Sequence, residues 1–128
     1  MKSLLFVGMG GFAGACARYL ITLAMGHWLP RAPFGTLLSN VLAGFLIGLI
    51  VGLERRGAAL GGNARLFLVP GLLGGLSTFS TFSMETVAMA EQGRYLAAGA
   101  NASLNVGLSL LFAVIGLAAA KSMLGWQS

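Results

Sequence analysis

Charge is what this chain has least of, and its scarcity decides where the chain can fold. Only 9% of the 128 residues are charged and 57% are hydrophobic, whereas about a quarter of the residues in a soluble domain are charged. Mean hydropathy is +0.87. So few polar side chains cannot cover a surface that faces water. We therefore expect residues 1–128 to form a single domain within a lipid bilayer.

Histidine, cysteine and acidic residues are also scarce, and this excludes most catalytic chemistry. The only histidine, His27, lies in a proline-bounded loop, and the lone Cys16 cannot form a disulfide within the chain. The sequence has no His, Cys and Asp cluster for a catalytic metal and no G-x-S-x-G motif for a serine hydrolase. "GMGGFAGA", residues 8–15, approaches a dinucleotide fingerprint, but no acidic residue follows about 20 positions later. We do not expect an enzyme.

The basic residues outnumber the acidic ones by eight to three, for a net charge of +5. No basic patch with interleaved aromatic residues is present, so nucleic acid is not an expected partner. The basic residues mostly flank apolar segments, as membrane anchors do, and a small bias between the two sides favours cytoplasmic termini. Lys2, Arg55, Arg56, Arg65 and Lys121 fall on the side of the termini, and Arg31 and Arg94 fall on the other.

Four long apolar segments follow one another, at about residues 4–26, 35–53, 66–90 and 95–120. Each has about the 20 residues that a helix needs to cross the hydrocarbon core. Short breaks with proline, glycine and charged residues separate the segments. The first segment is too long and too rich in glycine for a signal peptide. The sequence thus predicts an all-α membrane protein with four transmembrane helices.

Glycines recur at steps of four within three of these segments. Such steps line one face of a helix with small residues, where a neighbouring backbone can approach closely. Four helices enclose little interior, so we expect some of these faces to pack against a second copy of the chain. The alternative is that they pack only within one subunit. The glycines are Gly10 and Gly14, Gly44, Gly48 and Gly52, and Gly71 and Gly75.

Strongly polar residues also occur inside the apolar segments, where they are costly and are functional candidates. Arg18, Asn40 and Glu85 lie in the first three segments, and a stripe at steps of four lies in the fourth. Any single asparagine or serine is explained equally well by an interhelical hydrogen bond. The whole set predicts a polar path through the membrane. The stripe consists of Asn101, Asn105 and Ser109.

The stretch "GGLSTFSTFSMETV", residues 74–87, combines adjacent glycines with a run of hydroxyl groups. Both features disfavour a helix, so we predict a break near Gly74–Thr78. At membrane depth a break is tolerated only where it is buried in protein or lines a polar cavity. Its freed carbonyls can bind a cation, and the hydroxyl groups can donate to an anion. Phe79 and Phe82 share a helix face and can present positive ring edges.

Together with "GTLLSN", residues 35–40, and "GGFAGACARY", residues 10–19, this stretch resembles the Fluc (CrcB-like) family of fluoride ion channels. The resemblance covers nearly the whole chain. It implies a passive, highly selective channel that exports fluoride from the cytoplasm through the bacterial inner membrane. It also implies an antiparallel homodimer with dual topology, two pores, and a structural Na⁺ at the dimer interface.

The same resemblance implies roles for individual residues. Phe79 and Phe82 line the pores with their ring edges, and Asn40 donates an amide N–H to fluoride. The remaining roles are the ion path (Ser80, Thr81), a polar track (Thr36, Glu85, Ser109), the aqueous vestibule (Arg18), and Na⁺ binding through backbone carbonyls (Gly74, Ser77).

Two residues differ from the usual pattern of the family. Ser39 stands where valine is frequent, and Asn101 stands where some members have tyrosine.

Two other functions fit a chain of this size. A small four-helix exporter of cationic compounds, of the multidrug-resistance type, needs a membrane carboxylate in its first segment. Here the first segment carries Arg18 and no acid, and the candidate carboxylate, Glu85, lies in the third. A membrane subunit that transports nothing is the other alternative, and the polar stripe argues against it.

Overall fold

The computed structural model describes residues 1–30 and 32–124, and all regular structure in this part of the chain is helical. Arg31, which the charge count places opposite the termini, lies outside the described residues. The elements are α1 (Lys2–Trp28), α2 (Phe34–Glu54), α3 (Gly62–Leu66), a π-helical turn η1 (Phe67–Leu73), α4 (Gly74–Leu76), α5 (Phe79–Glu91) and α6 (Tyr95–Leu124).

Four segments of the described chain are long and apolar enough to cross a membrane. Three of them are the single helices α1, α2 and α6, and the third in chain order runs from Gly62 to Glu91 through α3, η1, α4 and α5. The predicted all-α membrane fold with four spans is therefore confirmed. So is the break in the third span, because Ser77 and Thr78 are extended between α4 and α5.

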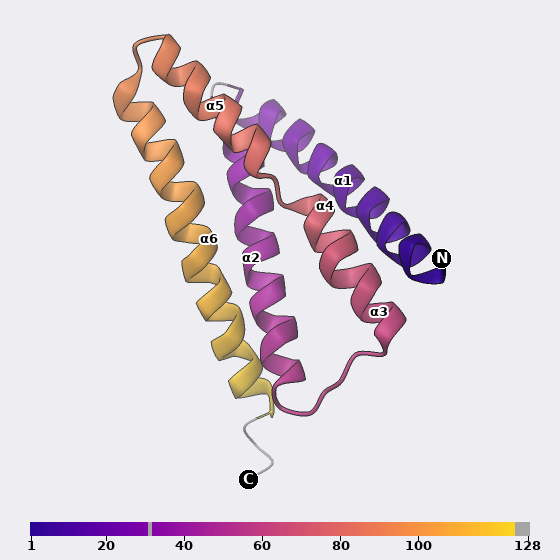
Figure 1. Cartoon of the computed structure of the whole chain (residues 1–128). Helices are drawn as coiled ribbons and strands as arrows, with labels where there is room; N and C mark the ends of the chain where they lie inside the picture. The colour runs from indigo at the N-terminus through magenta and orange to yellow at the C-terminus, as the bar shows by residue number, and fades with distance from the viewer. Residues whose placement is uncertain (31, 125–128) are drawn as a thin grey trace.

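Figure 1 shows α2 between α6 on one side and the α3–α4 segment on the other, with α1 beside that segment. Helix α5 leans across the upper end of α2 and returns through a tight turn to α6. The C-terminal ends of α2 and α6 lie at the same end of the bundle. The helix break therefore lies midway along the bundle, where α2 passes beside it.

Glycines set the distance between α2 and α6. A Cβ atom added at Gly44 would lie 2.6 Å from the carbonyl oxygen of Ser109, and one added at Gly48 would overlap the carbonyl oxygen of Ala113. From the opposite side, Gly116 faces the backbone of Phe45 in the same way. The prediction that glycine steps allow close helix approach is confirmed for this pair, since only hydrogen atoms fit between the backbones.

A second glycine contact joins α1 to the third span. Gly10 and Gly14 lie against the backbone of η1 and α4, and Gly71 and Gly75 lie against the backbone of α1. Gly10 and Gly71 face each other directly, whereas Gly14 and Gly75 each face backbone atoms of other residues on the opposite element. This contact fixes the position of η1 and α4 immediately before the break.

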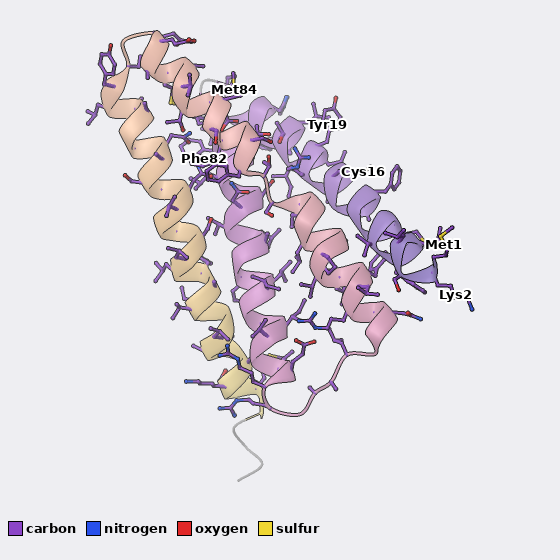
Figure 2. The ribbon with its side chains drawn as sticks, viewed as in Figure 1. Met1, Lys2, Cys16, Tyr19, Phe82 and Met84 are labelled. Carbon is purple, nitrogen blue, oxygen red and sulfur yellow. The ribbon has the colours of Figure 1, made fainter. Side chains whose placement is uncertain are left out.

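Large apolar side chains cover much of the outer surface. In Figure 2, Met1, Cys16, Tyr19 and Met84 point away from the bundle, whereas Phe82 points inward. The buried apolar cluster is small and centres on Ala43, Leu73 and Leu76. A single copy therefore leaves most of its apolar side chains for lipid or for a partner to cover.

Candidate functional site

The site begins at the break in the third span. Helix α4 ends at Leu76, Ser77 and Thr78 adopt extended backbone angles, and α5 begins at Phe79. The Thr78 hydroxyl caps the new helix by accepting the N–H of Thr81 at 3.2 Å. A threonine at this position satisfies one of the N–H groups that a helix start leaves free. The local sequence thus both ends one helix and starts the next.

A widened turn precedes the break. Residues Phe67–Leu73 form a π-helical turn with Pro70 inside it, and the Gly74 N–H bonds to the carbonyl of Val69, five residues back. Proline lacks the N–H that an α-helix needs, and its ring clashes with the carbonyl four residues earlier. The wider turn removes this conflict. Sequence reasoning missed this feature, although Pro70 inside an apolar segment was the signal for it.

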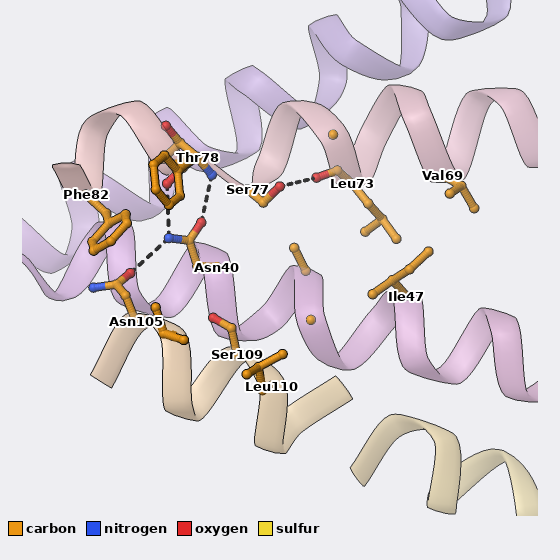
Figure 3. A pocket seen from close by; sticks show the side chains of 15 residues that line it. Asn40, Ile47, Val69, Leu73, Ser77, Thr78, Phe82, Asn105, Ser109 and Leu110 are labelled. Carbon is orange, nitrogen blue, oxygen red and sulfur yellow. Dashed lines mark hydrogen bonds between the residues drawn. The ribbon is translucent and has the colours of Figure 1, made fainter. Parts of the chain in front are cut away.

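Asn40, from α2, pairs with the backbone of the break (Figure 3). The Thr78 N–H donates to Asn40 Oδ1 at 2.7 Å, and Asn40 Nδ2 donates to the Thr78 carbonyl at 3.1 Å. The side-chain amide thus satisfies the N–H and the carbonyl of one residue, as a neighbouring strand would. Asn40 Nδ2 also donates to Asn105 Oδ1 of α6 at 2.9 Å. The break is therefore connected to both α2 and α6.

The two phenylalanines meet edge to face beside this amide. Their ring centroids are 5.0 Å apart and their planes are inclined by 75°. Phe82 is 9% exposed, whereas Phe79 is 77% exposed. One ring is thus part of the bundle, while the other stands on its surface. The edge-to-face arrangement leaves a positive ring edge available to an anion.

A groove of about 520 Å³ collects several of the predicted site residues. It is bounded by α2, the break and α6, and its walls are mainly apolar (Figure 3). The Ser109 hydroxyl is buried and has no hydrogen-bond partner within the described chain. It is therefore a free donor beside the groove. The predicted residues that line the groove are Asn40, Gly74, Ser77, Phe79, Phe82 and Ser109.

Of the predicted residues in α2 and α5, four do not line this groove. Thr36 of α2 donates to Glu85 Oε1 at 2.6 Å, and Glu85 Oε2 is buried with no partner in the described chain. Ser80 and Thr81 lie in the first turn of α5, where their hydroxyls lie near that of Thr78, at 3.3 and 3.0 Å. The pair of Thr36 and Glu85 forms a second polar site between α2 and α5.

Arg18 lies on α1 and is half-buried. Its Nε donates to the Gly75 carbonyl at 3.0 Å, so the guanidinium faces the last turn before the break. A cation is favourable there, because the carbonyls at the end of a helix carry partial negative charge. Arg18 is thus close to the break, and it does not line the groove.

The backbone carbonyls near the break bear on the predicted cation site. Because the Thr78 N–H bonds to Asn40, it cannot close the helical bond to the Gly74 carbonyl. Gly74 and Ser77 are both exposed on the open side of the break. Unwound carbonyls of this kind suit Na⁺. Gly74 and Ser77 would contribute two such carbonyls, fewer than a complete shell of ligands for Na⁺.

No side-chain metal site competes with this one. Among residues 1–30 and 32–124, no three His, Cys, Asp or Glu side chains lie close enough together to hold a metal ion. The free Cys16 is exposed on α1. Any cation at the break would therefore depend on backbone oxygens or on the neutral amide and hydroxyl oxygens beside them.

Residues 5–117 match the family model of the CrcB-like protein, described as camphor resistance (CrcB). The chain belongs to the CrcB family. It is similar to the fluoride-specific ion channel FluC of Clostridium perfringens, with 47% identity over 113 residues, which are 88% of each chain. The Clostridium novyi protein of the same name is 42% identical over 118 residues, 91% of this chain and 92% of the relative. That of Psychrobacter arcticus is 45% identical over 123 residues, 94% and 98% of the two chains.

Membership in the CrcB family confirms three of the expectations from the sequence. The resemblance to the Fluc (CrcB-like) family is confirmed by the family match and by the names of these relatives. The relatives are named as ion channels, so the chain belongs with channels and not with enzymes. Bacterial relatives and four spans together fit a multi-pass bacterial membrane protein.

Proposed function

We propose that the chain is a passive fluoride channel that exports fluoride from the cytoplasm. The observation that carries this proposal is the groove at the helix break, where amide and hydroxyl groups adjoin two edge-to-face phenyl rings. The names of the relatives support fluoride as the ion. The membrane potential, which is negative inside, drives the export. It moves an anion outward with about 2.3 kcal/mol per charge per 100 mV.

In this proposal, protein groups replace the water around fluoride as it passes the groove. The Ser109 hydroxyl is the readiest donor, because no group among residues 1–30 and 32–124 bonds to it. Both N–H groups of Asn40 already have acceptors, so fluoride competes for the longer bond, the one of 3.1 Å to the Thr78 carbonyl. Short contacts of this kind favour fluoride over chloride, which is larger and a weaker acceptor.

The polar site between α2 and α5 continues the proposed path. Thr36 and Glu85 place a hydroxyl and a carboxyl group one helix turn or more beyond the groove. Ser80 and Thr81 lie between the two sites in sequence, and Arg18 attracts anions toward the break. Arg18 acts as part of the vestibule by its charge and not by direct contact with the groove.

We further propose an antiparallel homodimer with two pores and one central Na⁺. Phe79 is 77% exposed, and Gly74 and Ser77 lie exposed beside it. A second copy packed across this face would cover the ring and complete each groove, and twofold symmetry makes the two pores equivalent. The same axis would bring the four carbonyls together, and a bound Na⁺ would neutralise their partial charges and hold the interface.

The test of this function is ion efflux from liposomes that contain the purified protein. Liposomes loaded with fluoride or chloride are given a potassium ionophore for the counter-current, and an electrode follows each anion. We expect rapid release of fluoride and retention of chloride, with protein-free liposomes as the control. Release of neither anion, or of both equally, would contradict a selective fluoride channel. In that case, transport of cationic dyes would test the exporter alternative.

Replacing either phenylalanine by isoleucine tests the role of the ring edges. Phe79→Ile and Phe82→Ile keep an apolar side chain but remove the positive edge, so we expect fluoride efflux to fall by about tenfold or more. Phe12→Ile on the outer face of α1 serves as the control, since Phe12 is 75% exposed away from the groove. Normal efflux in both groove variants would refute the aromatic role.

A further inference from the structure

A chain of side-chain hydrogen bonds runs from the break through α2 and α6. As described, Thr78 donates to Asn40, and Asn40 donates to Asn105. The chain then continues along α6: Asn105 Nδ2 donates to Asn101 Oδ1 at 3.1 Å and to the Asn101 carbonyl at 3.0 Å. Each asparagine therefore accepts through its oxygen and donates through its nitrogen.

The relay returns to α5 through Thr86. Asn101 Nδ2 donates to the Thr86 hydroxyl at 2.9 Å, and this hydroxyl donates to the carbonyl of Phe82 at 2.7 Å. The two ends of the relay thus lie close together in sequence, at Thr78, which caps α5, and at Phe82 in the first turns of α5. They connect the residue that forms the break to the residue that carries the buried ring.

The groups at the two ends fix the direction of every bond between them. At one end, a backbone N–H can only donate, so Asn40 must present its oxygen to Thr78. At the other end, a backbone carbonyl can only accept, so the Thr86 hydroxyl must donate its proton to Phe82 and accept from Asn101. Only one orientation of each of the three amides satisfies both ends.

Burial makes this orientation matter. Asn101 is 7% exposed and Asn105 is 4% exposed, so water has little access to replace a lost partner. A flipped Asn101 would place its nitrogen against the nitrogen of Asn105, where an acceptor is needed. A flipped Asn105 would do the same to Asn40, which shares a wall of the groove with it.

We propose that Asn101 and Thr86 are positioning residues that hold the Asn40 amide in the orientation that maintains the break. This role deepens the proposed channel function and, for its effect on transport, rests on it. Neither residue lines the groove, and each acts on the ion path only through its neighbours in the relay. Thr86 is thus remote from fluoride but sets the orientation of a pore amide.

Thr86→Val tests the relay, because valine matches the shape of threonine and lacks the hydroxyl. Without it Asn101 loses its acceptor, and we expect fluoride efflux per active liposome to fall by about fivefold, the effect of one buried hydrogen bond. Thr86→Ser restores the hydroxyl and should restore most of the efflux. Thr22→Val is the matched control, because the Thr22 hydroxyl also donates to a carbonyl four residues back but belongs to no relay.

A second measurement follows the amides directly. The chain has four asparagines, so ¹⁵N-asparagine labelling gives four side-chain amide signals by NMR, and Asn63 in α3 lies outside the relay. In Thr86→Val we expect the signals of Asn101, Asn105 and Asn40 to shift while that of Asn63 does not. In Thr86→Ser all four should stay close to their original positions.

The outcomes separate the relay from the channel function. If the unchanged protein releases no fluoride, the function fails, while the amide signals still report on the relay. An unshifted Asn40 signal in Thr86→Val, or equal efflux in the valine and unchanged proteins, would overturn the proposal. Should Thr86→Val not fold, Thr86→Ala removes the same hydroxyl from a smaller side chain and must shift the same three signals.

Discussion

Replacing Gly14 by alanine should leave most molecules of the protein unfolded or aggregated. A Cβ atom at this position would overlap the carbonyl oxygen of Leu72 and lie 2.9 Å from the Leu76 nitrogen. Both are backbone atoms, so no side chain can move aside, and α1 must separate from η1 and α4. We expect the free energy of unfolding to fall by at least about 3 kcal/mol, which is the upper end of the range for overpacking a close contact.

Gly8→Ala is the matched control on the same helix. A Cβ atom there would meet nothing within 4 Å, and alanine favours a helix over glycine by about 1 kcal/mol. Thermal unfolding in detergent, followed by size-exclusion chromatography, should show a stable Gly8→Ala protein and an aggregated or unfolded Gly14→Ala protein. Equal stability of the two variants would show that α1 does not pack through Gly14.

Replacing Asn40 by aspartate should abolish fluoride efflux while leaving the fold in place. Aspartate has nearly the shape of asparagine and keeps the oxygen that accepts the Thr78 N–H. It loses both donor bonds, however, and sets a carboxylate against the Thr78 carbonyl and Asn105 Oδ1. The charge also stands in the proposed path of an anion. We expect the efflux rate to fall by at least about 100-fold, because a like charge about 4 Å away raises the energy of the passing anion by roughly 4 kcal/mol at an effective dielectric constant of about 20.

Asn63→Asp makes the same chemical change outside the groove, on exposed α3, and should leave efflux unchanged. Efflux from liposomes measures both variants, and size-exclusion chromatography checks that each remains assembled. Fluoride release by Asn40→Asp at the rate of the unchanged protein would remove Asn40 from the ion path. It would also show that the donor bonds of its amide do not matter for conduction.

The sequence was sufficient for the membrane fold because length and composition determine it. Apolar runs of about 20 residues predict spans without any knowledge of their partners. The break was also predictable, because Gly74, Gly75 and the hydroxyl run weaken the helix locally. It lies within the predicted range, with Ser77 and Thr78 extended. Both the spans and the break are local properties, so the residues within each segment are enough to predict them.

The contacts between helices could not be predicted in the same way. The polar stripe predicted that Asn101 and Asn105 share a helix face, but not that Asn105 reaches Asn40, 65 residues away. Thr86 was not singled out, since its role depends on how α5 is rotated against α6. The unequal exposure of Phe79 and Phe82 likewise follows from packing, because the two residues are alike in sequence context.

The π-helical turn at Pro70 has a consequence for how this chain is aligned with its relatives. A π-turn contains one residue more than an α-turn, and each residue of an α-helix turns the chain by about 100°. Deleting one residue between Phe67 and Leu73 would restore a regular helix and leave Gly74, and everything up to the break, in nearly the same orientation relative to α3. A regular α-helix through all seven residues would instead rotate them by about that angle. A relative with a one-residue gap here would therefore keep every motif and direct its carbonyls toward the same neighbour, with a regular helix in place of the π-turn.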